Sequence, residues 1–366
     1  MALRALFSAS AIGLGHAARA IAIADDLRRE LSVEPFFLAG GPAIDLIASS
    51  GHDVQVMEPT PPFEAEDGRL VRVGRWYRRY FAHYRRVRRW LREEVPWKDY
   101  DFVVCDGDAP TASVAKEYAR PVVFIAHRLR QDFADSFAAR VLEAIANHAY
   151  RRLAARMDLV LALEEPDGGN VRHISPIART PSRPREELRE DFSFLKKTVL
   201  ITAGGSHLGG FLIEAATKAA LGLERSDIQV VVSTGPSLKL PPGLPVFNYG
   251  FTANQHDLIA AADLVISLAG KGTIAQALSS GTPVIAIPIR GHEEQMRNAA
   301  ALGYRHEDLS QLGSLIATTL SEARPAPAPT GNETAVRLIS ELLGRKGLLP
   351  GTGRPSPMAG ETRPSR

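Results

Sequence analysis

The stretch ADLVISLAGKGTIAQALSSGTPVIAIPIRGHEEQMRNAAAL, residues 262–302, decides the fold class. It begins with a short apolar run, and a glycine turn with Gly270 and Gly272 precedes a helix that we expect from Thr273. A Gly-Thr-Pro turn then leads to a second apolar run at 284–287 and to another helical segment. Short apolar runs that alternate with helices are typical of a parallel sheet covered by helices. The stretch therefore predicts an α/β domain.

The same alternation covers most of the 366 residues. In the first half we predict a helix at 17–30 and strands at 3–8, 35–39, 54–57, 102–105, 122–126 and 159–163. In the second half we predict a terminal helix at 331–345 and strands at 199–202, 229–233, 246–249, 264–267 and 284–287. This pattern predicts two doubly wound, Rossmann-like domains. Ligands of such sheets bind beyond the carboxyl ends of the strands, so we expect the domains to face each other across a cleft.

Composition sets the expected boundaries. Proline, arginine and acidic residues dominate at 164–197, where the apolar periodicity fades, as in an interdomain linker. We therefore expect an N-terminal domain at 1–165, a linker at 166–197 and a C-terminal domain at 198–345. The tail at 346–366 is rich in Gly, Pro, Ser and Arg and is expected to be disordered.

Charge and cysteine content restrict the function classes. The net charge of +3 is too small to indicate a nucleic-acid partner. No run of about 18 apolar residues is present, so we expect no transmembrane helix. The apolar pattern of the first twenty residues continues through Ile21 and Leu27, which favours a helix over a cleaved signal peptide. The single cysteine, Cys105, excludes an internal disulfide and fits a reducing cytoplasm.

The stretch SASAIGLGHAARAIAIADDL, residues 8–27, contains a glycine turn at the end of the first predicted strand. Gly13 and Gly15 permit a tight turn and let a ligand approach the backbone. The third glycine of a dinucleotide fingerprint is replaced by Ala18, which disfavours NAD. His16 lies at the predicted helix N-terminus, where the helix dipole favours a neutral imidazole that can act as a general base. A histidine that only caps the helix is the alternative.

Two further turns suit a sugar nucleotide. Gly204, Gly205 and Ser206 lie between a strand and a helix, where backbone N–H groups and a hydroxyl can bind a phosphate, although a merely connecting turn is the alternative. In the second turn, Thr273 adds a hydroxyl, and Gln276 lies on the same helical face, within reach of a ribose. A carboxylate and a carboxamide side by side suit the hydroxyls of a sugar ring, and the chain has this pair at Glu294 and Gln295.

The 262–302 stretch resembles the donor-nucleotide motif of GT-B glycosyltransferases, especially MurG-type enzymes. The matching residues are Gly270, Thr273, Gln276, Gly281, Pro283, Pro288, Glu294, Gln295 and Asn298. GLGHAAR, residues 13–19, resembles the family's acceptor loop and implies acceptor contacts for Gly13, Gly15 and Arg19. GGS at 204–206 resembles the diphosphate loop, and 249–263 resembles the segment whose backbone, near Phe251, meets the base. The likeness extends from the N-terminus to about residue 345.

Two positions depart from the family pattern. The family usually has Glu where this chain has Gln276, which would make a ribose contact neutral and alter donor preference. MurG-type enzymes carry a basic residue where this chain has Leu268. Lys271, inside the turn, could replace that charge, and a solvated loop lysine is the alternative.

Polar residues also end two strands of the first half. Asp106 and Asp108 follow the strand that ends at Cys105, and His127 ends the next one. We expect all three in the cleft, where either aspartate could orient an acceptor or position His16. No CxxC or HxxxH spacing suggests a metal site.

A basic aromatic segment at 69–92 holds ten arginines and no acid. Trp76, Tyr80, Tyr84 and further apolar residues recur every three or four positions and so share one helical face. Three interpretations follow: a core helix with a solvated basic face, a helix that contacts an anionic membrane or a lipid-phosphate acceptor, and, third, a nucleic-acid contact.

The resemblance implies an inverting, metal-independent transfer of a hexose or N-acetylhexosamine from a UDP-sugar to an acceptor hydroxyl, with His16 as the base. No cofactor is expected, since the UDP-sugar is a substrate. A lipid-linked acceptor and a cytoplasmic protein, peripheral on the inner face of the membrane, agree with the basic segment. The alternatives are a UDP-sugar hydrolase like those of the pseudaminic acid pathway, a sugar-nucleotide 2-epimerase and an inactive nucleotide-sugar-binding protein.

Overall fold

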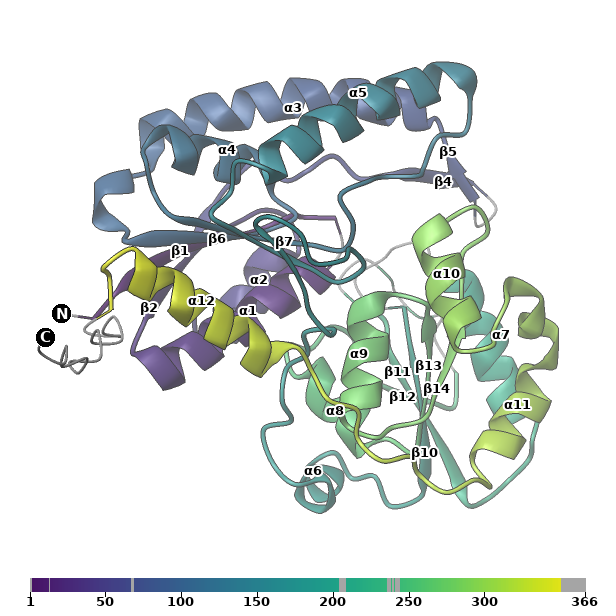
Figure 1. Cartoon of the computed structure of the whole chain (residues 1–366). Coiled ribbons are helices and arrows are strands. Elements are labelled where there is room, and N and C mark those ends of the chain that lie inside the picture. Colours follow the sequence, from purple (N-terminus) through teal and green to yellow (C-terminus); the bar gives the residue numbers. More distant parts are fainter. Residues whose placement is uncertain are drawn as a thin grey trace, which may run out of the picture.

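The computed structural model describes residues 2–12, 14–66, 69–203, 209–235, 238, 240 and 244–349. Two parallel sheets, each flanked by helices, form two α/β domains (Figure 1). This arrangement confirms the predicted fold class. Predicted and observed strand bounds agree within two residues, and β7 (Val122–Ala126) and β14 (Val284–Ile287) agree at both ends.

The N-terminal domain contains a seven-stranded parallel sheet with the order β3-β2-β1-β6-β7-β8-β9. Its other strands are Arg4–Ala9 (β1), Glu34–Ala39 (β2), Val54–Val56 (β3), Phe102–Asp106 (β6), Leu159–Ala162 (β8) and Val171–His173 (β9). The central strands are continuous runs of Val, Ile, Leu and Phe because helices bury both faces. An antiparallel hairpin, β4 (Glu64–Glu66) and β5 (Arg69–Val71), stands outside this sheet.

Helices cover both faces of the N-terminal sheet. The first face packs against α1 (Gly15–Leu31) and α2 (Ala43–Ser49). The second packs against α3 (Val73–Glu94), α4 (Ala109–Glu117) and α5 (Phe137–Ala154), and a short 3-10 helix, η1, spans Trp97–Asp99.

The C-terminal domain contains a five-stranded parallel sheet with the order β12-β11-β10-β13-β14. The other strands are Lys197–Thr202 (β10), Ile228–Ser233 (β11), Phe247–Asn248 (β12) and Leu264–Leu268 (β13). One face packs against α7 (Gly210–Leu221) and α11 (Leu312–Thr319), and the other against α8 (Gln255–Ala261). The remaining helices are α9 (Lys271–Ser279), α10 (Glu293–Ala301) and the 3-10 helix η3 (His306–Gln311).

The segment expected to be a linker, 166–197, contains a strand and a helix that pack on the domains. Strand β9 extends the N-terminal sheet by pairing with β8. Helix α6 (Arg185–Asp191) packs on the C-terminal domain, where Arg185 and Arg189 contact the carboxylate of Asp263 at 2.6 and 2.9 Å. The arginines that suggested a solvated linker are therefore anchors, and β9 is too short to show a strand pattern.

The terminal helix α12 (Asn332–Arg345) corrects the expected domain boundary. It belongs to the N-terminal domain, because its apolar residues, including Val336 and Ile339, share a buried core with α1 and β1 (Figure 1). Residues 346–349 of the expected disordered tail continue this contact, and Lys346 Nζ lies 2.7 Å from Asp158 Oδ1. The rest of that tail, 350–366, lies outside the described residues.

Trp76 and Tyr77 of α3 are buried inside the protein, and Tyr80 and Tyr84 are half-buried. Trp76 donates a hydrogen bond to the carbonyl of Pro61 at 2.8 Å, and the Tyr77 hydroxyl donates to Glu143 at 2.9 Å. These contacts agree with the core-helix interpretation and contradict the insertion of the aromatic face of α3 into a membrane. Among the described helices, none combines the length and apolar character that a membrane crossing requires.

We predict that Ile339→Ala destabilises the N-terminal domain by about 2–5 kcal/mol, because it leaves a cavity at a fully buried position. All three tryptophans, Trp76, Trp90 and Trp97, lie in this domain, so urea unfolding followed by tryptophan fluorescence reports on it alone. Arg337→Ala, on the exposed side of the same helix, is the control. An unchanged midpoint for Ile339→Ala would contradict this placement of α12.

Candidate functional site

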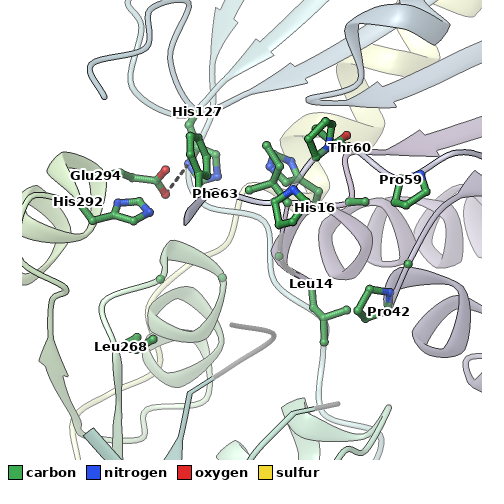
Figure 2. A pocket seen from close by; sticks show the side chains of 18 of the residues that line it. Leu14, His16, Pro42, Pro59, Thr60, Phe63, His127, Leu268, His292 and Glu294 are labelled. Atoms are coloured by element: carbon green, nitrogen blue, oxygen red, sulfur yellow. Dashed lines mark ion pairs between the residues drawn. The ribbon is translucent and has the colours of Figure 1, made fainter. Parts of the chain in front are cut away.

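A cavity of about 990 Å³ lies between the two domains, at the carboxyl ends of both sheets. The turn after β1 and the segment at 58–63 form its N-terminal wall, while the turn after β13 and the start of α10 form its C-terminal wall. Figure 2 shows His16 and His127 on the N-terminal side and His292 and Glu294 opposite them. This is the cleft that the tandem-domain pattern predicted.

His16 and Asp106 form a hydrogen-bonded pair beside this cavity. His16 is in the first turn of α1, Asp106 ends β6, and Nδ1 of the imidazole lies 2.6 Å from Oδ1 of the carboxylate. The Asp106 side chain is fully buried, whereas the His16 side chain is 21% exposed. The imidazole can therefore meet a ligand while the carboxylate holds its orientation.

Arg19 ties this pair together from the next turn of α1. Its Nε and a terminal nitrogen donate to the two oxygens of Asp106 at 2.8 and 2.6 Å, in a bidentate ion pair. Burial alone would raise the pKa of Asp106, but Arg19 and then His16 outweigh burial and hold that pKa below its ordinary value. Asp106 is consequently ionised at neutral pH. Arg19, which we expected to contact an acceptor, is itself almost fully buried.

Gly107 makes room for the His16 ring. Its φ of +66° is a conformation that side chains rarely adopt, and a Cβ at this position would lie 2.7 Å from Cε1 of His16. Any other residue at position 107 would therefore have to displace the imidazole.

His127 lies at the end of β7, on the far side of Arg19. Its Nε2 is 2.5 Å from an Arg19 nitrogen, and Nδ1 is 4.0 Å from Glu294 Oε1 across the cleft (Figure 2). Burial lowers the pKa of His127 well below its ordinary value, and the charges of Arg19, His16 and Lys271 lower it further. His127 is therefore neutral at pH 7 and accepts the Arg19 hydrogen bond.

The turn after β13 forms the opposite wall. Gly270 is the N-cap of α9, and Lys271 to Thr273 form the first helical turn, which leaves backbone N–H groups without helical partners. Lys271 Nζ contacts Glu164 Oε1 of the N-terminal domain at 2.5 Å. A Cβ on Gly272 would lie 3.7 Å from the Cα of Gly15, so the glycine turns of the two domains meet here.

Two polar residues of α10 line the cavity, and a third supports the neighbouring glycine turn. Glu294 and Gln295 line the cavity, although the Gln295 side-chain oxygen already accepts a hydrogen bond from the Ile289 N–H at 3.0 Å. Asn298 is buried and donates to the Ala269 carbonyl at 3.0 Å. Asn298 thus holds the preceding glycine turn in place.

The structure brings ten of the predicted site residues to the described lining of this cavity, namely Gly15, His16, Arg19, His127, Gly270, Lys271, Gly272, Thr273, Glu294 and Gln295. Phe251, Gln276 and Asn298 lie outside it: Phe251 packs against the N-terminal core, and the other two are buried in their helices. Asp108 is also buried and accepts a hydrogen bond from the Thr111 hydroxyl at 2.6 Å. Gly13, Gly204, Gly205 and Ser206 lie outside the described residues.

Sequence reasoning missed several residues of the site. His292 is the N-cap of α10 and lies edge-on to Phe133 of the N-terminal domain. Gly107 could have been noticed, because it stands between two acids at a strand end. The sequence did not indicate Glu164 as a site residue, because it lies at the start of a stretch whose composition resembles a linker.

A smaller cavity of about 180 Å³ also contacts His16 and His127. Its lining combines aromatic side chains, including Phe63, Trp76, Tyr80, Phe133 and Tyr150, with charged ones such as Arg128, Asp132 and Arg297. Phe63, Trp76 and Tyr80 form a continuous parallel stack. Within the described residues, no cluster of three His, Cys, Asp or Glu side chains is suited to hold a metal ion.

Comparison with known proteins gives matches in both halves of the chain. Residues 198–316 match the glycosyltransferase family 28 C-terminal domain, and residues 45–183 match glycosyltransferase family 4. An uncharacterized glycosyltransferase of Methanosarcina acetivorans is 26% identical over 312 residues, which cover 79% of each chain.

A second relative, from Mycobacterium avium, is a UDP-N-acetylglucosamine--N-acetylmuramyl-(pentapeptide) pyrophosphoryl-undecaprenol N-acetylglucosamine transferase. It is 29% identical over 298 residues, or 78% of this chain and 71% of that protein. Among solved structures, CalG4, the calicheamicin glycosyltransferase, aligns with a TM-score of 0.57 and 14% identity over 94% of this chain and 99% of that chain. This last similarity shows the fold.

We predict that His127→Gln makes the stability of the protein less sensitive to acid. Below about pH 6.5 the unfolded chain takes up a proton on His127 that the folded site refuses, so the free energy of unfolding falls by up to about 1.4 kcal/mol per pH unit. The variant lacks this contribution. Urea unfolding of both proteins at about pH 7.5 and about pH 5.5 measures the difference. Equal losses would mean that His127 also takes up the proton when folded.

Proposed function

This chain is a glycosyltransferase with the GT-B fold, and we propose that it transfers a hexose or N-acetylhexosamine from a UDP-sugar to an acceptor hydroxyl. The transfer inverts the anomeric carbon and needs no metal. The observation that carries this proposal is the His16–Asp106 pair, which faces the glycine turn of α9 across the cleft.

The C-terminal wall is suited to the donor. Free N–H groups in the first turn of α9, the Lys271 ammonium and the Thr273 hydroxyl can stabilise the charge of the departing diphosphate. The Mycobacterium avium relative is named for a UDP-N-acetylglucosamine donor, which supports a UDP-sugar here. Gln276 is largely buried and lies outside the described cavity lining, so its contact with a ribose stays a prediction.

The N-terminal wall supplies the base. If Nδ1–H of His16 donates to the ionised Asp106, the lone pair of Nε2 is available to a ligand. Nε2 takes the proton of the acceptor hydroxyl while that oxygen attacks the anomeric carbon and UDP leaves from the opposite face. Asp106 then stabilises the imidazolium. A single displacement of this kind inverts the anomeric centre.

The aromatic cavity next to His16 favours an organic acceptor over water. Its walls can hold a ring or chain next to the base, which a hydrolase does not require. The Mycobacterium avium relative is named for an undecaprenol-linked acceptor, which supports a lipid-linked one here.

A membrane-facing surface would bring such an acceptor to the cleft. Helices α3 and α5 lie side by side on the outside of the N-terminal domain (Figure 1). Phe137, Val141 and Ile145 form an exposed apolar stripe on α5, one turn apart from each other. Arg78, Arg85 and Arg89 are exposed on α3 and have no ion pair among the described residues. An apolar stripe beside arginines suits an anionic membrane surface.

We predict that His16→Ala lowers acceptor-dependent UDP release from UDP-N-acetylglucosamine or UDP-glucose by about 100- to 10,000-fold, because it removes the general base. Affinity for UDP, measured by calorimetry, should change little, since His16 faces the donor turn from the other wall. His173→Ala, which changes an exposed histidine on β9 away from the cleft and from α5, is the control.

Three outcomes of that assay would contradict the proposal. The acceptor in this assay is supplied as an added lipid extract. UDP release that does not depend on this extract would indicate a hydrolase. UDP binding without turnover of any donor would indicate a binding protein, and a full rate for His16→Ala would show that His16 is structural.

We further predict that replacing Arg78, Arg85 and Arg89 by Gln weakens binding to phosphatidylglycerol vesicles by about 100-fold, at about 1 kcal/mol per basic residue. Co-sedimentation measures the bound fraction, and circular dichroism confirms that the variant is folded.

The control for this experiment removes the same charge from the C-terminal domain, by replacing the exposed residues Lys196, Lys218 and Arg225 with Gln. Equal vesicle binding by the two triple variants would rule out α3 as the membrane-facing element.

A further inference from the structure

Lys271, the only described cation in the glycine turn of α9, is paired with the opposite domain. Its ammonium lies 2.5 Å from Glu164 Oε1, and the two side chains are 20% and 21% exposed. The pair is therefore neither buried nor fully hydrated, and a ligand in the cleft can reach Lys271, which lines the large cavity.

The backbone and the side chain of Glu164 are both held by neighbouring residues. Glu164 is the second residue after the end of β8, and its backbone N–H donates to the His127 carbonyl at 2.9 Å. Arg128 and Arg297 approach its second oxygen, Oε2, to 3.9 and 4.0 Å. One carboxylate thus lies among three cations from two domains, and Arg128 also approaches the carboxylate of Asp132 at 3.7 Å.

The Glu164 carboxylate thus binds Lys271, the cation that would attract the phosphates of the donor. We propose that Glu164 is an internal anion that holds Lys271 until the diphosphate of the donor replaces it, so that donor binding breaks a contact between the domains. The inference rests on the proposed function, since it requires a diphosphate in this turn. Glu164 itself is a positioning residue and not a catalytic one.

The exchange makes donor affinity and the interdomain contact depend on each other. A diphosphate competes with Glu164 for the Lys271 ammonium, so the pair lowers the affinity for any ligand with a phosphate at this position. By linkage, the bound diphosphate weakens the interdomain contact by the same factor. After transfer, Glu164 competes again for Lys271 and assists the release of UDP.

Calorimetry with UDP and with uridine tests this inference. Glu164→Gln keeps the shape of the side chain and removes its charge, so UDP should bind about fivefold more tightly, as expected for loss of a partly exposed ion pair. Uridine, which has no phosphate, should bind with unchanged affinity. Glu165→Gln is the matched control, because the Glu165 carboxylate accepts a bond from the Leu129 N–H and does not contact Lys271. Glu164→Ala is a second variant if Glu164→Gln does not fold.

A double-mutant cycle separates exchange from a general charge effect. In a Lys271→Ala background, Glu164→Gln should leave UDP affinity unchanged, because the ammonium for which Glu164 and the diphosphate compete is absent. Unchanged UDP affinity in Glu164→Gln alone, or an equal gain with Lys271→Ala present, would overturn the inference and leave the proposed function intact. Failure of the unmodified protein to bind UDP would overturn both.

Discussion

The buried ion pair between Arg19 and Asp106 is the interaction on which the candidate site depends. It joins the second turn of α1 to the end of β6, and both side chains are almost completely removed from water. Removing one partner of such a pair leaves an uncompensated buried charge, which costs about 3–5 kcal/mol, so the two residues stabilise the fold only as a unit. His16 acquires its orientation from this unit, because the carboxylate that binds Arg19 also receives the imidazole. Glycine at 107 allows the ring to lie so close to the strand end, because it adopts a positive φ without strain and has no Cβ to contact the imidazole.

Much of the fold could be predicted because parallel strands buried on both faces are continuous apolar runs. The limits of the prediction have equally physical causes. The apolar stripe of α12 indicates that one of its faces is buried, but it does not indicate against which sheet. In β9, three residues with little apolar character pair through their backbone, which has no sequence signature. The arginines of α6 are typical of a solvated linker, and only the structure shows that they bind Asp263.

In the candidate site, too, local sequence patterns predicted some features, while others depend on tertiary contacts. His16, Asp106 and His127 could be placed together because β1, β6 and β7 are neighbours in the sheet and their carboxyl ends meet at one edge. The turns of the C-terminal half could be predicted for the same reason. Side-chain directions could not: Gln276 and Asn298 share helices with cavity residues, yet both side chains are buried. The pairing of Glu164 with Lys271 depends on how the two domains meet, and no local pattern encodes that geometry.

The position of α12 also determines the order in which the protein can fold during synthesis. The N-terminal sheet needs α12 to cover part of one face, yet α12 is encoded after the entire C-terminal domain. As the chain leaves the ribosome, α1, α2 and the strands of the first half emerge with part of their apolar surface uncovered. Domains generally fold as units from the N-terminus onward, but here the core of the N-terminal domain is complete only after α12 has been made. The C-terminal domain has all of its strands and core helices before that point.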